Sequence, residues 1–263
     1  MSHYSVAVIT DKDTTVEELL APYDENISVE KRLLYTREDL IRNARSHLDR
    51  FYNARYIPYK NDPEGFLKTE CDGDKGSQLY KYTMSFMDRY NETDEQLLQR
   101  ELEYYDEDMK DEDGNVYTVR NPDSKWDWYA IGGRFNGMLI DKKSGKIRNE
   151  LPAKNIDFQK MWENAKYEME PYEGALTDSW YKPEYLKRIY PDEATYERIA
   201  TTFWTRAVVT PDGQWHEIGE MGWFGFSSEE PEETIRWVSN YYDQFIDPAI
   251  EYGCTIHIVD CHI

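Results

Sequence analysis

A ten-residue segment of the sequence holds most of the residue types that a ligand site needs. It contains three aromatic rings, a carboxylate, a glycine pair and two cations: Lys125, Trp126, Asp127, Trp128, Tyr129, Gly132, Gly133 and Arg134. Rings can stack on a base, an aspartate can accept from a ribose hydroxyl, glycine N–H groups can approach a phosphate and an arginine can neutralise it. The segment, here called the aromatic–glycine segment, therefore has the parts of a site for a nucleotide-like ligand, although its spacing fits no dinucleotide fingerprint or P-loop.

The same segment also has a structural interpretation. The tryptophans would fill the core, Gly132 and Gly133 would form a bulge or hairpin, and Arg134 would pair with Asp127. The two interpretations differ in whether the segment lines a cavity or is filled by side chains.

Histidines are scarce, and two of them lie where a site could use them. His216 is on an expected strand next to Glu217, close to a glycine- and aromatic-rich loop whose Trp223 joins the candidate ligand-binding residues. His262 is on the expected last strand and could act with the aromatic–glycine segment if the two are neighbours. The candidate catalytic residues are therefore Asp127, Arg134, His216 and His262.

Several kinds of chemistry lack their sequence signature. Cys261 precedes His262, but consecutive strand residues point to opposite faces, so these two side chains cannot form a nucleophile–base pair. The paired HxT or HxS motifs of two-histidine phosphoesterases are absent, as are GxSxG and HExxH. The three cysteines show no CxxC spacing, so we expect no structural zinc, no cofactor and a reducing cytoplasm.

Negative charge is concentrated in residues 92–113, here called the acidic stretch. It holds eleven acidic and two basic residues. It is either a solvated helix face, a cation site or a surface that imitates a phosphate backbone and binds a basic groove of a host protein. The cation site is disfavoured because the alternating ligands and distal glutamate of an EF-hand are missing. The candidate partner-binding residues are Glu101, Glu103, Asp106, Glu107, Asp108 and Asp111.

Composition excludes some classes of partner. The 263 residues carry a formal net charge of −21, which argues against direct binding to nucleic acid or to an anionic membrane. We find neither a signal peptide nor an apolar run long enough to span a bilayer, and so expect a cytoplasmic protein. With 40% hydrophobic and 15% aromatic residues, the chain should fold around a substantial core.

The periodicity of apolar residues predicts the elements that must position these side chains. Strands are expected at 4–10, 116–119, on both sides of the glycine pair, and at 203–209, 214–218 and 255–261. Helices are expected from the capping box at Thr14 to Leu20, from Thr36 to about 52, at 78–90 and 94–105, from Asn155 to about 169 and from 228 to about 248. Residues 61–76 are expected to form a loop.

This order predicts an α+β fold, with an antiparallel or mixed sheet, helices packed mainly on one face and an acidic helical insertion. We expect a single domain over residues 1–263, with the helical elaboration at about 30–120. The oligomeric state is left open.

Four blocks of the sequence resemble a family of uncharacterised proteins from tailed bacteriophages and prophages. They are residues 1–9 with 20–26, residues 125–129 with 132–135, residues 219–225 and residues 259–263. The resemblance implies a phage accessory protein in the host cytoplasm, where such acidic proteins often antagonise host defence. It assigns no activity.

Our leading hypothesis from the sequence is a non-enzymatic counter-defence or host-modulating protein that binds a host protein or a nucleotide signal. The alternative is an enzyme that acts on a nucleotide or a protein side chain, through the aromatic–glycine segment and the C-terminal histidine. A further alternative is a structural or assembly protein of the phage particle.

Overall fold

The computed structural model describes residues 2–177, 180–220 and 227–263, which form two compact units. Met1–Ser28 and Arg120–Ile263 make up the first, here called the sheet unit, and Val29–Val119 make up the second, the helical unit. The helical elaboration expected at about 30–120 covers nearly the same residues as the second unit. Trp223 lies outside the described residues.

The sheet unit is built on a mixed six-stranded sheet in the order β4-β10-β1-β8-β9, with β7 also paired to β10. The strands are β1 (His3–Thr10), β4 (Trp128–Ile131), β7 (Glu150–Pro152), β8 (Ala207–Val209), β9 (Trp215–Glu217) and β10 (Thr255–His262). β1 pairs parallel to β8, and the other pairs are antiparallel. The predicted α+β class is confirmed, as are the terminal strands and the β8–β9 hairpin.

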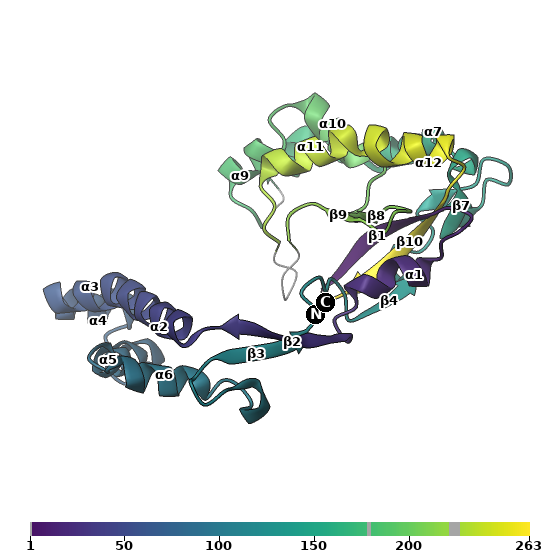
Figure 1. The fold of residues 1–263 in the computed structure, drawn as a ribbon. Helices are drawn as coiled ribbons and strands as arrows, with labels where there is room; N and C mark the ends of the chain where they lie inside the picture. Colours follow the sequence, from purple (N-terminus) through teal and green to yellow (C-terminus); the bar gives the residue numbers. More distant parts are fainter. Residues whose placement is uncertain (1, 178–179, 221–226) are drawn as a thin grey trace. The chain divides into compact units, whose positions relative to one another are not determined.

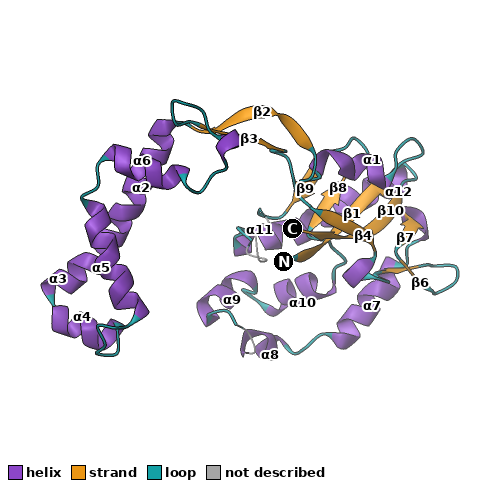
Figure 2. Cartoon of the chain, turned by 90° about the horizontal axis from the view of Figure 1, so that it is seen from below, coloured by secondary structure: helices purple, strands orange, loops and turns teal. Residues whose placement is uncertain are grey.

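Helices cover mainly one face of this sheet (Figures 1 and 2). They are α7 (Phe158–Glu168), α8 (Tyr172–Thr177), α9 (Pro183–Ile189), α10 (Glu193–Thr201), α11 (Pro231–Tyr241) and α12 (Asp247–Glu251). Alternate strand residues such as Ala7, Ile256 and Ile258 pack against this layer with Tyr241 and Phe245. The intervening residues pack on the other face, against α1 (Val16–Leu20) and Trp126. Alternation along the strands thus gives the sheet two apolar faces.

Ser2 and Ile263 lie at one end of the sheet. Ser2 N–H donates to the Ile263 carbonyl and Ile263 N–H donates to the Ser2 carbonyl, each at 3.1 Å. The first and last strands therefore pair along their whole length.

Two long helices each contain one π-helical turn, which is wider than an α-helical turn. α2 (Arg37–Phe51) continues through the π-helical turn η2 (Tyr52–Tyr56) into α3 (Ile57–Asn61), and α11 continues through η7 (Tyr242–Ile246) into α12. In both, the following helix has a proline as its second residue, Pro58 or Pro248. Proline lacks an N–H and its ring clashes with the carbonyl four residues earlier, so the preceding turn widens. The helix expected to end near Pro248 therefore continues to Glu251.

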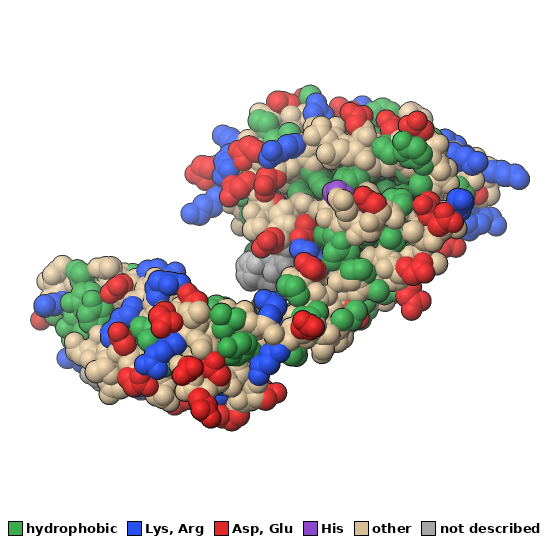
Figure 3. All heavy atoms as spheres, viewed as in Figure 1, with side chains coloured by type: hydrophobic (Ala, Val, Ile, Leu, Met, Phe, Trp, Pro, Cys, Tyr) green, Lys and Arg blue, Asp and Glu red, His purple; other side chains and the backbone are tan. Residues whose placement is uncertain are grey.

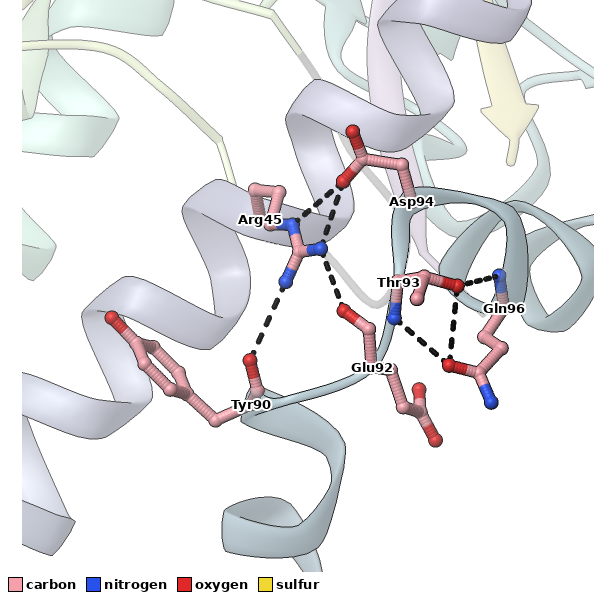
Figure 4. A network of polar contacts seen from close by, with 6 residues as sticks. All are labelled: Arg45, Tyr90, Glu92, Thr93, Asp94 and Gln96. Atoms are coloured by element: carbon pink, nitrogen blue, oxygen red, sulfur yellow. Dashed lines mark hydrogen bonds and ion pairs between the residues drawn. The ribbon is translucent and has the colours of Figure 1, made fainter.

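The helical unit contains α2, α3, α4 (Pro63–Glu70), α5 (Gln78–Tyr90) and α6 (Asp94–Leu102), with a ribbon of β2 (Ser28–Tyr35) and β3 (Val116–Arg120). The expected apolar stripe of α2 is confirmed, since Leu40, Ala44 and Leu48 are buried. Arg45 of α2 donates to Asp94 and to the carbonyls of Tyr90 and Glu92, which holds the turn between α5 and α6 (Figure 4).

Some expected boundaries are wrong. Residues 61–76 are not a continuous loop, because the Asp62 side chain accepts from Gly65 N–H and Pro63 opens α4. The first capping box is formed by Thr15 and Glu18 rather than one residue earlier, and α7 is capped by Asp157 rather than Asn155. α10 was not expected at all. No helix in the described part of the chain is long and apolar enough to cross a membrane.

Candidate functional site

The pairing of the first and last strands brings polar residues together at one end of the sheet. His3 lies opposite His262, and Ser5 lies opposite Asp260. Residues two apart on a strand share a face, so all four side chains belong to the helix-covered face, which is apolar further along the strands. Trp128 of β4 lies opposite His262 on the other side of β10. The site is therefore a polar end of an otherwise apolar surface.

Each of the two histidines is bonded to an aspartate. His262 Nδ1 lies 2.6 Å from Asp127 Oδ1, and His3 Nδ1 lies 2.9 Å from Asp260 Oδ1. A carboxylate at Nδ1 favours the tautomer that carries the proton there, which leaves the Nε2 lone pair as the basic atom of the ring. The two pairs are thus two oriented imidazole bases.

The rings of this site contact one another. The centroids of His3 and His262 are 5.0 Å apart, and Trp128 stacks on His262 at 5.0 Å with an interplanar angle of 18°. Trp128 is 44% exposed, whereas Asp260 and His262 are buried. We call His3, Asp127, Trp128, Asp260 and His262 the His–Asp cluster; it lies just below the surface, with Trp128 as its most exposed member.

Gly133 and the backbone N–H of Arg134 lie against the Asp260 carboxylate. Asp260 Oδ2 accepts from the Arg134 N–H at 2.9 Å, and a Cβ at Gly133 would lie 2.4 Å from the same oxygen. Gly133 has a φ of +50°, so both the backbone conformation and the close approach require glycine. Of the glycine N–H groups expected to approach a ligand phosphate, that of Gly132 donates to the Ile258 carbonyl at 2.8 Å.

The other residues of the aromatic–glycine segment divide between the two faces. Trp126 is 7% exposed, its Nε1–H donates to the Leu20 carbonyl, and Tyr129 packs edge-on against it on the far face of the sheet. Lys125 forms an ion pair with Glu217. For Trp126 and Tyr129 the structural interpretation is therefore correct, while Trp128 points to the cluster. Arg134 is exposed, and the pairing expected with Asp127 is wrong, because Asp127 bonds His262.

His216 lies elsewhere. It is on β9, three strands from β10, which at about 4.8 Å per strand is about 14 Å away. Its ring contacts Phe245 and lines a cavity between β9 and α11. Of the four candidate catalytic residues, the structure brings Asp127 and His262 together, adds the backbone of Arg134, and leaves His216 apart.

The thiol next to the cluster is not an available nucleophile. Cys261 points to the opposite face, and burial raises the pKa of its thiol well above the ordinary value. A buried neutral thiol is unreactive.

Many carboxylates of the acidic stretch have local partners. Glu92, Asp94, Glu95 and Glu107 pair with cations of the helical unit: Arg100, Arg45, Arg37 and Lys110. The Asp111 carboxylate accepts from the side chain and backbone of Asn115, and these hydrogen bonds lower its pKa. Glu103, Asp106, Glu107 and Asp108 are exposed, and Glu101 is half-buried. Figure 3 shows cations interspersed with the acids on the visible face of this unit.

Sequence reasoning missed His3 and Asp260. The available signal was a polar residue two positions from a histidine on each terminal strand, His3-x-Ser5 and Asp260-x-His262. No group of three or more histidine, cysteine, aspartate or glutamate side chains in the described ranges is arranged to hold a metal ion.

Three of the four sequence blocks singled out above, residues 1–9 with 20–26, 125–129 with 132–135, and 259–263, are neighbours around the cluster. β1 and β4 both pair with β10, and Glu25 N–H donates to the Trp126 carbonyl at 2.8 Å. Of the remaining block, residues 221–225 lie outside the described part.

Comparison with protein-family models, with curated proteins and with solved structures finds no match for the chain. The function is therefore argued from the geometry of the site.

Proposed function

We propose that the His–Asp cluster is an acid–base catalytic site that acts on a nucleotide. One observation carries the proposal: two imidazole rings in contact, each held at Nδ1 by its own carboxylate. Paired carboxylate–imidazole groups are a common means of orienting a general base.

The two histidines would divide the proton transfers. An imidazole ring can act as a general base in its neutral form and as a general acid in its protonated form. The neutral ring accepts at Nε2 a proton from the attacking hydroxyl or water, and the protonated ring donates its Nε2 proton to the leaving group. Asp127 orients His262 and Asp260 orients His3, and both stabilise the imidazolium form.

The surroundings favour a nucleotide over a protein side chain. Trp128 is the half-exposed ring of the cluster, and a flat aromatic face stacks on a base. Arg134 is exposed, and its backbone contacts the cluster through Asp260. An arginine there can neutralise a phosphate group.

The test is turnover of a nucleotide panel, followed by chromatography of the products. The panel contains nucleoside mono-, di- and triphosphates and cyclic dinucleotides. His3→Gln and His262→Gln should each lower turnover by about 100-fold or more, and each should remove one limb of a bell-shaped pH profile. His47→Gln, in the helical unit, should leave turnover unchanged.

The proposal is wrong if no member of the panel is turned over, or if both glutamine variants fold and keep wild-type turnover. Circular dichroism and thermal unfolding of each variant separate loss of catalysis from loss of the fold.

A second candidate function is supported by the exposed carboxylates Glu103, Asp106, Glu107 and Asp108. Here the chain is a phage accessory protein in the host cytoplasm that captures a host protein with a basic groove. Such a partner also binds DNA, so duplex DNA should release it from the immobilised protein. Capture should weaken between low and physiological salt. A captured protein that neither DNA nor salt releases would contradict this function, and abundance in purified virions would favour an assembly role instead.

A further inference from the structure

A cavity of about 530 Å³ lies in the sheet unit between β9 and α11, remote from the His–Asp cluster. The side chains that matter for the argument come from both elements: His216, Arg236, Trp237, Asn240, Gln244 and Phe245. This volume is in the range of sites that hold small molecules, about 300–1,000 Å³.

The aromatic side chains of this cleft are fixed by contacts. The Trp237 ring lies 5.4 Å from the Phe245 ring, which in turn lies 5.3 Å from the His216 ring. Trp237 Nε1–H donates to the Thr205 carbonyl at 3.0 Å, so its position is set by the backbone. A ligand ring would meet a preformed apolar floor.

One side of α11 and its continuation supplies the polar groups. Arg236, Asn240 and Gln244 are four residues apart, which places them along one side of a helix. The opposite side buries Val238 and Tyr241 in the core. Guanidinium and amide groups together offer donors for an anionic group and for ring heteroatoms.

The carboxylates around the cleft already have partners. Glu217 pairs with Lys125, Glu230 and Glu232 pair with Arg188, and the Glu233 carboxylate accepts from Glu230 N–H in a capping box. Arg236, by contrast, is exposed and has no carboxylate within ion-pair distance among residues 2–177, 180–220 and 227–263. In a chain of net charge −21, an exposed arginine that forms no ion pair within the described ranges, at the edge of an aromatic cleft, is suited to an anion.

We propose that the β9–α11 cleft binds a small planar molecule that carries one anionic group. The ring lies on Trp237 and Phe245, the carboxylate or phosphate meets the Arg236 guanidinium, and Asn240 and Gln244 bond the heteroatoms of the ring. The site is separate from the His–Asp cluster and does not depend on its activity.

Calorimetric titration of the whole chain tests the proposal with two probes, anthranilate for an aromatic carboxylate and AMP for a nucleotide monophosphate. At least one probe should bind, and Arg236→Glu should weaken binding by about tenfold or more, because a charge-assisted hydrogen bond is replaced by repulsion. Arg236→Lys should keep part of the affinity.

The matched control is Arg50→Glu, which makes the same charge change at an exposed position of α2 in the helical unit. It should leave binding unchanged, as should His262→Gln in the cluster. The proposal is overturned if neither probe binds at millimolar concentration, or if Arg50→Glu weakens binding as much as Arg236→Glu. Loss of binding in His262→Gln alone would place the probe in the cluster and would also overturn it.

Discussion

The aromatic–glycine segment and the acidic stretch are the two most chemically distinctive parts of the sequence. In the structure their residues differ in burial and in bonding partners. In the first, Trp126 lies in the core, Asp127 bonds His262 and Gly133 lies against Asp260, while Trp128 and Arg134 are exposed. In the second, four carboxylates pair with nearby cations, and much of the rest faces solvent.

The difference shows that a high density of charged residues in a sequence does not indicate where the candidate catalytic residues lie. The carboxylates that orient histidines, Asp127 and Asp260, stand singly in the sequence, 133 positions apart, and are brought together by strand pairing. The eleven acids of the acidic stretch lie close together in sequence; four of them pair with cations of the helical unit, and Asp94 and Glu95 lie in the first turn of α6. Substitutions should therefore change folding stability in the first segment, whereas substitutions of the exposed acids in the second should change mainly salt-dependent binding.

The largest expected effect separates the two tryptophans of the aromatic–glycine segment. Trp126→Ala removes a buried ring and leaves the Leu20 carbonyl without its donor, so it should cost about 3–5 kcal/mol. Trp128→Ala, at the half-exposed ring, should cost about 1 kcal/mol or less. Chemical denaturation measures the free energy of unfolding of both variants. Equal losses would contradict the assignment of the two rings to opposite faces.

Gly133→Ala is expected to have the next largest effect. It should lower the free energy of unfolding by about 2–3 kcal/mol, because the new Cβ would overlap the Asp260 side chain and because the backbone at residue 133 is in the left-handed region. Gly213→Ala is the matched control: its φ is +81° but its Cβ would have nothing within 4 Å. That control should lose about 1–2 kcal/mol from backbone strain alone. If both variants lose the same stability, the contact with Asp260 does not constrain residue 133.

A smaller effect is expected on the pH dependence of folding stability in the sheet unit. His257, on the far face of β10, bonds Thr10 through Nε2, and burial lowers its pKa below 6.5. As the pH falls below 6.5, the unfolded chain takes up this proton before the folded chain does, so stability decreases until the folded-state pKa is passed. His257→Gln should show a shallower decrease in melting temperature between pH 7 and pH 5 than the wild type. An unchanged slope would contradict the depressed pKa.

The smallest effect is expected in the acidic stretch. Glu103→Gln, Asp106→Asn and Asp108→Asn together should change stability by less than about 0.5 kcal/mol, since these side chains are exposed. Asp111→Ala should lower the melting temperature measurably, because it removes the acceptor of the Asn115 backbone N–H and of the Tyr117 hydroxyl. Thermal unfolding of both proteins is the measurement, and a large loss in the triple variant would show a structural role for the exposed acids.

Local patterns in the sequence predicted most of the fold. The apolar residues of 4–10 and 255–261, the stripe of α2 and the Pro211–Gly213 turn predicted their elements, because each pattern is decided within a few residues. The prediction of a loop at 61–76 was wrong. It was based on the many glycine, aspartate and lysine residues, but Asp62 is the N-cap of α4 and Pro63 is the first residue of that helix.

The candidate site was only partly predictable. Asp127 and His262 were proposed from residue type and strand position. His3 and Asp260 were missed because their contact depends on the register between strands 257 residues apart in sequence. Alternation would place Trp126 and Trp128 on the same face. They lie on different faces because β4 begins only at Trp128, and Trp126, before the strand, donates its Nε1–H to the Leu20 carbonyl of α1.

The two π-helical turns have a consequence for the insertion and deletion of residues. A π turn holds one residue more than an α turn, so it shifts the angular phase of every side chain that follows it. Deletion of one residue from Tyr52–Tyr56 or from Tyr242–Ile246 can convert the π turn into an α turn and keep the angular phase of α3 or α12, where Ala249 lies in the core. The conversion restores the clash of the Pro58 or Pro248 ring with the preceding turn, so it lowers stability without rotating the buried face. The regular part of α2 or α11 contains no extra residue that a deletion could remove. A deletion there rotates the apolar stripe out of the core. These two turns are therefore the positions at which the long helices can change length and keep their packing.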